Sequence, residues 1–238
     1  MSERVALVTG AASGLGAAVA GRLQKDGYDV VGLDLETPEP WIEQGDVRVE
    51  ADVARVVGSA ATRGPLTAMV LSAAVETRAS IVDTSDDEWQ RIIDTNLKGP
   101  FLCMKHAVPH MVAGGGGSIV AMGSTLGAIV APQYPAYCAS KFGLTNLCKQ
   151  VAIEHAPDNV RVNVLSLGPT DSGLFVRLTD MAPDPEAVRA GVAANLPMKR
   201  LGRASEVCDA VSFLLSDASG WTSGAVLPLD GGLAARRQ

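Results

Sequence analysis

Residues 5–34 read VALVTGAASGLGAAVAGRLQKDGYDVVGLD and carry the strongest structural signal of the chain. The apolar run 5–8 predicts a strand, the Gly-rich segment 9–16 a turn, and residues 17–24 a helix with one apolar side. A second apolar run, 30–33, ends at Asp34. This order of strand, Gly-rich turn, helix, strand and acid is typical of a site that holds a dinucleotide.

The residue types of this segment suit that ligand. Gly10, Gly14 and Gly16 allow the backbone to come close to a pyrophosphate, and the free N–H groups at the start of the helix favour negative charge. Asp34 follows Gly16 by 18 positions and can accept hydrogen bonds from both hydroxyls of an adenosine ribose. An ordinary strand-to-helix turn would explain the glycines alone, but it does not explain the acid at the end of the second strand.

Composition narrows the class of protein. The chain has 238 residues, of which 47% are hydrophobic, enough for one large α/β domain with a substantial core. Its net charge of −6 argues against a nucleic-acid partner. No apolar run approaches the roughly 20 residues of a membrane span, and residues 1–4 do not resemble a signal segment. The four cysteines have no metal-binding spacing, so we expect free thiols, no metal site and a cytoplasmic location.

Apolar runs alternate with helical patterns along the rest of the chain. We predict further strands at 47–50, 68–72, 118–122, 161–167 and 225–229, and helices at 53–61, 86–96, 101–111, 136–156 and 205–216. Residues 171–199 hold two short helical pieces separated by Pro183 and Pro185, which we interpret as a lid. The alternation predicts a single α/β domain over 1–238, a doubly wound (Rossmann) parallel sheet of about seven strands with helices on both faces.

Ligands of such sheets bind at the carboxyl ends of the strands. The following polar or small residues stand at or just after a predicted strand end and are expected to face one crevice: Ser13, Asp34, Asp52, Ser72, Ser124 and Gly168.

A second cluster has the composition of an acid/base site. Tyr137 and Lys141 are four positions apart and share one side of a helix. A phenol with a pKa of about 10 is a poor base at neutral pH, and a nearby ammonium lowers that pKa. Ser124 follows a predicted strand and can bond the substrate oxygen beside Tyr137. Taken singly, the Tyr/Lys pair also fits a solvated helix face, Ser124 the start of a loop, and Asn96 the end of a helix.

Taken together, these motifs resemble the classical short-chain dehydrogenase/reductase (SDR) family over almost the whole chain. The resemblance rests on Thr9-Gly10-x-x-x-Gly14-x-Gly16, on Asp94-x-Asn96-x-x-Gly99, and on Ser124 followed by Tyr137-x-x-x-Lys141. It implies four catalytic residues: Tyr137 as the acid/base, Lys141 to lower its pKa and bind the nicotinamide ribose, Ser124 to orient the substrate oxygen, and Asn96 to hold a water that connects Lys141 to solvent.

The resemblance also implies a cofactor site. Asp52 and Val53 match positions that contact adenine, and residues 168–170 match a stretch that holds the nicotinamide amide. The residues expected to bind the cofactor are Gly10, Ser13, Gly14, Leu15, Gly16, Asp34, Asp52, Val53, Ser72, Ala73, Ala74, Tyr137, Lys141, Gly168, Pro169, Thr170 and Ser172. The chain departs from the family where Leu71-Ser72-Ala73-Ala74 replaces Asn-Asn-Ala-Gly, which predicts a looser fit there.

Cofactor choice follows from charge. Asp34 repels a 2′-phosphate, residues 35 and 36 are Leu and Glu, and Ser13 stands where NADP-preferring members often carry a basic residue. We therefore expect NAD.

The expected reaction interconverts a secondary alcohol and a ketone by hydride transfer. Apolar residues of the lid favour an apolar, alicyclic or hydroxysteroid-like alcohol, and we expect no arginine or lysine placed for a substrate carboxylate. The alternatives are a 3-ketoacyl-type reductase and a catalytically idle NAD-binding regulator. Apolar residues around the helices at 101–111 and 142–153 favour an oligomer, and the family resemblance implies a homotetramer.

Overall fold

The structure is a computed structural model that describes residues 4–237. Its centre is one parallel sheet with the strand order β3-β2-β1-β4-β5-β6-β7. The strands are β1 Val5–Thr9, β2 Asp29–Asp34, β3 Ile42–Gln44, β4 Leu66–Leu71, β5 Gly117–Met122, β6 Val160–Leu167 and β7 Val226–Leu229. The prediction of a doubly wound parallel sheet of about seven strands is confirmed.

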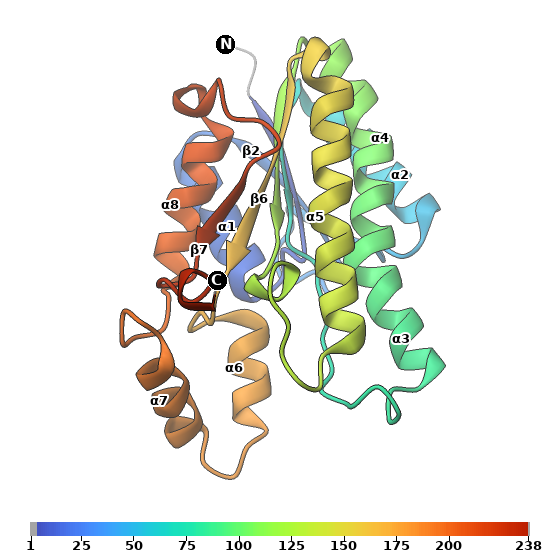
Figure 1. Ribbon diagram of the computed structural model, residues 1–238. Coiled ribbons are helices and arrows are strands. Elements are labelled where there is room, and N and C mark those ends of the chain that lie inside the picture. The colour runs from blue at the N-terminus through green and yellow to red at the C-terminus, as the bar shows by residue number, and fades with distance from the viewer. Residues whose placement is uncertain (1–3, 238) are drawn as a thin grey trace.

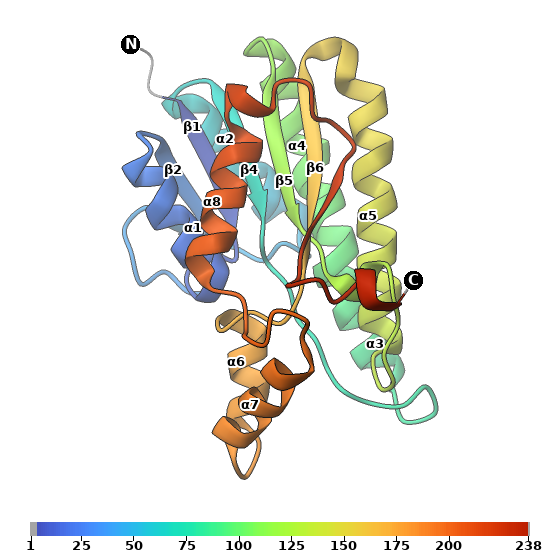
Figure 2. The same cartoon turned by 60° about the vertical axis from the view of Figure 1, so that its left-hand side comes forward.

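Helices cover both faces of the sheet (Figure 1). Buried residues of α1 and α8 pack on one face, and buried residues of α2, α4 and α5 pack on the other. The α-helices are α1 Gly14–Lys25, α2 Glu50–Arg63, α3 Asp86–Ile93, α4 Gly99–Ala113, α5 Pro135–His155, α6 Gly173–Asp180, α7 Pro185–Asn195 and α8 Ala204–Leu215. Figure 2 shows α6 and α7 projecting beyond the sheet as a separate lid, in line with the helical pieces expected at 171–199.

Local sequence explains where these elements begin. Every residue of β1 is at most 2% exposed, as expected for a central parallel strand covered on both faces. The Ser85 hydroxyl accepts a hydrogen bond from the N–H of Glu88 and caps α3. The Asp184 carboxylate caps α7 in the same way, and Pro135 occupies the first turn of α5, where its missing N–H costs nothing.

The strand predicted at 47–50 is wrong. The third strand is Ile42–Gln44, and α2 already begins at Glu50. Residues 46–49 form a turn, in which the N–H of Val49 bonds the carbonyl of Asp46 and the Asp46 carboxylate accepts from the N–H of Arg48. The alternation of Val47 and Val49 therefore comes from a turn in which Val47 packs inward and Val49 is exposed.

The topology fixes where a ligand can bind. In the chain β4 follows β3, but in the sheet β4 lies beside β1. The strand order therefore reverses between β1 and β4. A crevice at such a reversal, beyond the carboxyl ends of the strands, is the usual ligand site of doubly wound sheets. Within residues 4–237, no helix combines the length and the hydropathy needed to cross a membrane.

Candidate active site

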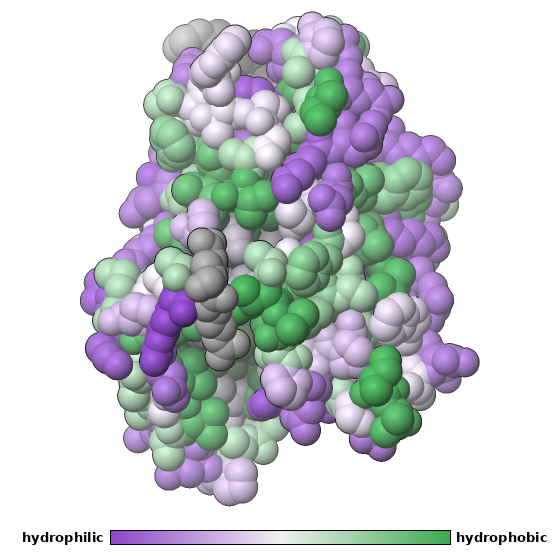
Figure 3. Space-filling model, viewed as in Figure 1, coloured by the Kyte–Doolittle hydropathy of each residue, from purple (hydrophilic) through white to green (hydrophobic). Residues whose placement is uncertain are grey.

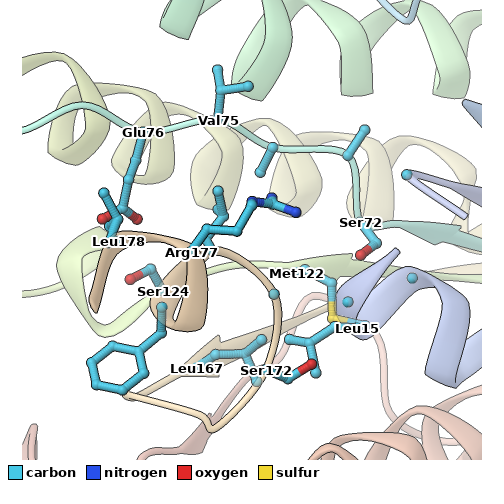
Figure 4. Close-up of a pocket in the computed structure, with 18 of the residues that line it drawn as sticks. Leu15, Ser72, Val75, Glu76, Met122, Ser124, Leu167, Ser172, Arg177 and Leu178 are labelled. Carbon is cyan, nitrogen blue, oxygen red and sulfur yellow. The ribbon is translucent and has the colours of Figure 1, made fainter. Parts of the chain in front are cut away.

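A large pocket lies at the carboxyl ends of the strands, beneath the lid. Its volume is about 1020 Å³. The pocket brings together most of the residues that the sequence placed at strand ends: Ser13, Asp34, Ser72, Ser124 and Gly168. Figure 4 shows Leu15, Ser72 and Ser172 at one side of the pocket and Glu76, Ser124 and Leu178 at the other.

The Gly-rich turn forms one wall of the pocket, and side chains at its glycines would collide with neighbouring backbone. A Cβ atom on Gly10 would lie 2.8 Å from the Cα of Ala73, and one on Gly14 would lie 2.7 Å from the Cα of Gly173. Both glycines also have positive φ angles, of 68° and 57°. These positions require glycine, and the turn leads directly into the N-terminus of α1, so its residues fit a pyrophosphate.

The departure at Leu71-Ser72-Ala73-Ala74 leaves the backbone of this stretch tied to the Gly-rich segment. The Thr9 hydroxyl accepts hydrogen bonds of 3.1 Å from the N–H groups of both Ser72 and Ala73. Ala73 lies against Gly10, and Ser72, Ala73 and Ala74 all line the pocket. Because these bonds use backbone donors, they do not depend on the asparagines that the family has here.

Asp34 is held at the end of β2 with its carboxylate toward the turn. Its Oδ2 accepts a 2.9 Å bond from the N–H of Ala12, and its Oδ1 accepts a 2.7 Å bond from the N–H of Leu35. The residue lines the pocket and is partly exposed. This carboxylate is fixed before any ligand arrives and has lone pairs left for ribose hydroxyls.

Asp52 and Val53, expected near adenine, do not line the pocket. Val53 is fully buried in the core, and the Asp52 carboxylate accepts a 3.0 Å bond from the N–H of Asp46. Because the third strand ends at Gln44, Asp46 and Val47 occupy the wall of the pocket instead. The motif Gly45-Asp46-Val47, which begins three positions after Ile42, was the available signal for this position.

Three of the proposed catalytic residues meet where β5 leads into α5. Ser124 follows β5, and its hydroxyl accepts a 3.1 Å bond from the N–H of Leu126. Tyr137 and Lys141 lie on the first two turns of α5 and are 8% and 3% exposed. The Lys141 Nζ donates a 2.8 Å bond to the carbonyl of Met122 and lies 5.6 Å from the centre of the Tyr137 ring.

The pKa of Tyr137 shifts in the direction opposite to the one expected. Burial raises the pKa of this phenol, the carboxyl of Glu76 adds to the shift, and Ser124 opposes it. Burial also lowers the pKa of Lys141 to about 8. The ammonium points at a carbonyl and not at the phenol, so desolvation decides both pKa values in the ligand-free protein.

Asn96 lies in a π-helical segment, η1 Asp94–Lys98, between α3 and α4. Its side chain is 1% exposed. The amide Oδ1 accepts a 2.8 Å bond from the N–H of Val75, and Nδ2 donates to the carbonyl of Val75 at 2.8 Å and to the Ser140 hydroxyl at 3.2 Å. Asn96 thus joins the segment after β4 to the helix that carries Tyr137 and Lys141.

The chain after β6 forms the remaining wall. Position 168 requires glycine, because a Cβ atom there would lie 2.7 Å from the Cα of Asp230. Pro169, Thr170 and Ser172 follow along the pocket, and the Thr170 hydroxyl donates to the carbonyl of Gly168. From the lid, Leu174, Phe175 and Leu178 line the cavity, whereas Met181 and Met198 are exposed.

The pocket also contains charged residues that the sequence did not single out. We expect no arginine or lysine placed for a substrate carboxylate, and the structure shows that Arg78, Arg91 and Arg177 line the pocket. Arg177 reaches from the lid and donates a 3.3 Å bond to the Ser13 hydroxyl (Figure 4). Glu76, two positions after Ala74, lines the opposite end.

This arrangement can exchange a proton with a substrate oxygen between Ser124 and Tyr137, beside a cradle for a dinucleotide. Among residues 4–237, no group of three or more His, Cys, Asp or Glu side chains is arranged to hold a metal ion. The described Cys103, Cys138, Cys148 and Cys208 are buried free thiols.

Comparison with known proteins agrees with this geometry. A family model described as enoyl-(acyl carrier protein) reductase matches residues 10–234. The cis-4-hydroxycyclohexanecarboxylate dehydrogenase of Sinomonas cyclohexanicum is 38% identical over 250 residues, which span 98% of each protein. The trans-4-hydroxycyclohexanecarboxylate dehydrogenase of the same organism is 34% identical and covers 98% of this chain and 93% of its own.

Solved structures give the same result. The ligand-free aldohexose dehydrogenase of Thermoplasma acidophilum superposes with a TM-score of 0.94 at 30% identity, covering 98% of this chain and 95% of its own. The chain belongs to the short-chain dehydrogenase/reductase family. It is an oxidoreductase that acts on CH–OH groups, a class that uses a nicotinamide cofactor.

Proposed function

We propose that this protein is an NAD-dependent dehydrogenase of alicyclic secondary alcohols. The observation that carries this proposal is the meeting of Ser124, Tyr137 and Lys141 with the glycine cradle and Asp34 in one pocket. NAD, when bound, supplies the nicotinamide ring that accepts the hydride. Gly10, Gly14 and Gly16 would hold its pyrophosphate, Asp34 its adenosine ribose, and residues 168–172 its amide.

The side chains of this protein bind the substrate hydroxyl and accept its proton. We expect the substrate hydroxyl to bond both the Ser124 hydroxyl and the Tyr137 oxygen, which takes up the proton as the ketone forms. Lys141, whose ammonium is held by the carbonyl of Met122, would bond the nicotinamide ribose and stabilise negative charge on Tyr137. Asn96 would position a water molecule between Lys141 and solvent.

The walls of the pocket support an alicyclic substrate. Val75, Leu126, Leu174, Phe175 and Leu178 form apolar surface near Ser124 and Tyr137. Two relatives are named as dehydrogenases of hydroxycyclohexanecarboxylates, which supports a six-membered alicyclic substrate. A hydroxysteroid-like alcohol is the other substrate in this class. The four free thiols support a cytoplasmic location for the protein.

The direct test is oxidation of cyclohexanol and substituted cyclohexanols by NAD, followed by the absorbance of the reduced cofactor. Tyr137→Phe removes the proton acceptor and keeps the ring, so we expect kcat to fall on the order of 10²–10⁴-fold while NAD binding is retained. Tyr28→Phe is the matched control, because Tyr28 packs against the α1 side of the sheet and is not part of the pocket.

Equal rates for the Tyr137→Phe variant and the parent would contradict this mechanism. NAD binding without turnover of any alcohol or ketone would favour the catalytically idle regulator. Turnover confined to 3-ketoacyl thioesters would favour the ketoacyl reductase.

A further inference from the structure

One carboxylate at the catalytic end of the pocket has no part in the mechanism above. Asp34, Glu36 and Asp46 also line the pocket, but they follow β2 and β3 at the adenosine end. Glu76 follows β4 and lies at the opposite end, with Ser124 and Leu178 (Figure 4). Its charge contributes to the pKa values of both Tyr137 and Lys141, so it lies within electrostatic reach of the reacting groups.

The residues before and after Glu76 are both hydrogen-bonded to neighbouring helices, which fixes the position of Glu76. The backbone of Val75 is bound through its N–H and its carbonyl to the buried amide of Asn96. The Thr77 hydroxyl donates a 2.7 Å bond to Glu88 and accepts one from Arg91. The backbone that carries Glu76 is therefore fixed against α3 and η1, and its side chain projects into the cavity.

The carboxyl of Glu76 lacks an internal partner. Between residues 4 and 237, no hydrogen bond or ion pair joins it to another side chain or to the backbone, and the residue is partly buried. Burial raises the pKa of this carboxyl, whereas the charges of Lys141, Arg78 and Arg177 lower it. A carboxyl that faces a cavity without an internal donor is free to accept a hydrogen bond from a bound substrate.

The surrounding charges select the kind of donor. The positive charges of Lys141, Arg78 and Arg177 lower the pKa of this carboxyl, so they also oppose a cationic substrate group beside it. A substrate carboxylate at this end would meet Glu76 itself. A neutral hydroxyl avoids both penalties and donates one hydrogen bond to a carboxyl oxygen.

We propose that Glu76 is a specificity-determining residue that accepts a hydrogen bond from a second hydroxyl of the substrate, so that the preferred substrate class is a ring alcohol with a further hydroxyl near the reacting carbon. This inference rests on the proposed alcohol dehydrogenase function and narrows its substrate class. In this arrangement Leu178 and Phe175 contact the apolar side of the substrate ring, and Glu76 accepts a hydrogen bond from the second hydroxyl.

The test compares cyclohexanol with the 1,2- and 1,3-cyclohexanediols in the parent, in Glu76→Leu and in Glu76→Gln. We expect the parent to prefer at least one diol by about 10- to 100-fold in kcat/KM, the range of a hydrogen bond to a charged group. Glu76→Leu should abolish this ratio, which is taken relative to cyclohexanol in the same variant so that a change in the pKa of Tyr137 or Lys141 affects both substrates. Glu76→Gln keeps an acceptor oxygen and should retain part of the ratio.

Glu154→Leu provides the matched control, because Glu154 is exposed near the end of α5, outside the pocket, and undergoes the same chemical change. Quenching of bound NADH fluorescence by each alcohol measures binding without turnover. If no alcohol is oxidised but diols still bind in a Glu76-dependent way, the proposed reaction fails and this inference stands. A diol ratio that is unchanged in Glu76→Leu, in turnover or in binding, overturns the inference.

Discussion

Asp34 shows how one side chain can set cofactor choice. Backbone N–H groups of Ala12 and Leu35 hold its two oxygens at 2.9 and 2.7 Å, so the carboxylate cannot turn away from a ligand at the end of β2. A 2′-phosphate placed beside it would meet a fixed negative charge, whereas a 2′-hydroxyl would donate to it. Arg177 of the lid also donates a hydrogen bond to Ser13 on the same turn.

We expect the parent to use NAD in preference to NADP. Replacing Asp34→Ser together with Leu35→Arg removes the repulsion and adds a guanidinium that bonds phosphate, so the ratio of kcat/KM for NADP over NAD should rise on the order of 100-fold. Leu35→Arg alone is the control, because it adds the cation and keeps Asp34. A parent enzyme that already favours NADP would refute the role given to Asp34.

At the same scale, the motif residues could be predicted because their residue types and their spacing along the chain together indicate their chemistry. Tyr137 and Lys141 share a helix side at any register of the surrounding sheet, and the glycines at 10, 14 and 16 mark the turn directly. Glu76 and Arg177 could not be predicted as pocket residues. Their side chains meet the pocket through a loop and a lid, whose placement depends on packing that spacing does not record.

Among the elements, the segment between β2 and α2 was the hardest to read from sequence. An edge strand of three residues has bonds to β2 alone, and its apolar pattern is too short to recognise. The turn at 46–49 resembles a strand in sequence because its valines alternate. The resemblance to the family placed the adenine contacts at Asp52 and Val53, which do not line the pocket, whereas Asp46 and Val47 do. Among longer elements, β6 differed from prediction by one residue at its start and α5 by one residue at each end, because both have long apolar patterns with many buried residues.

The π-helical segment η1 is the element that ties the catalytic helix to the strand ends. Asn96→Ala removes both bonds to the partly buried backbone of Val75 and the bond to the Ser140 hydroxyl. We expect the free energy of unfolding to fall by about 1–3 kcal/mol and kcat to fall as well, since the segment that carries Glu76 and the helix that carries Tyr137 both loosen. Denaturant unfolding and steady-state kinetics measure the two effects.

Asn146→Ala serves as the control for this change. Asn146 is exposed on α5, and its amide donates a single 3.2 Å bond to the carbonyl of Phe142. Its loss should change stability by a few tenths of a kcal/mol. An Asn96→Ala variant as stable and as active as the Asn146→Ala variant would mean that the contact with Val75 has no structural weight.

At the scale of the whole molecule, apolar side chains remain exposed on two surfaces. Phe101 and Phe142 lie on α4 and α5 and are 46% and 37% exposed. Phe213 of α8 and Leu227 of β7 are also exposed, and hydrophobic residues gather over the middle of the face that contains α8 and β7 (Figure 3). A tetramer with three two-fold axes needs more than one kind of self-complementary surface, and two exposed apolar surfaces supply them.

We therefore predict a homotetramer, with a mass in sedimentation velocity four times the 24.6 kDa of the chain. Phe142→Glu places a charge in the α4–α5 surface and should halve that mass, because the second surface still joins two chains. Ala190→Glu introduces the same charge at an exposed position of α7, which belongs to neither surface, so this control should leave the mass unchanged. A parent protein that sediments as a monomer at micromolar concentration would show that both surfaces are free of copies of this chain.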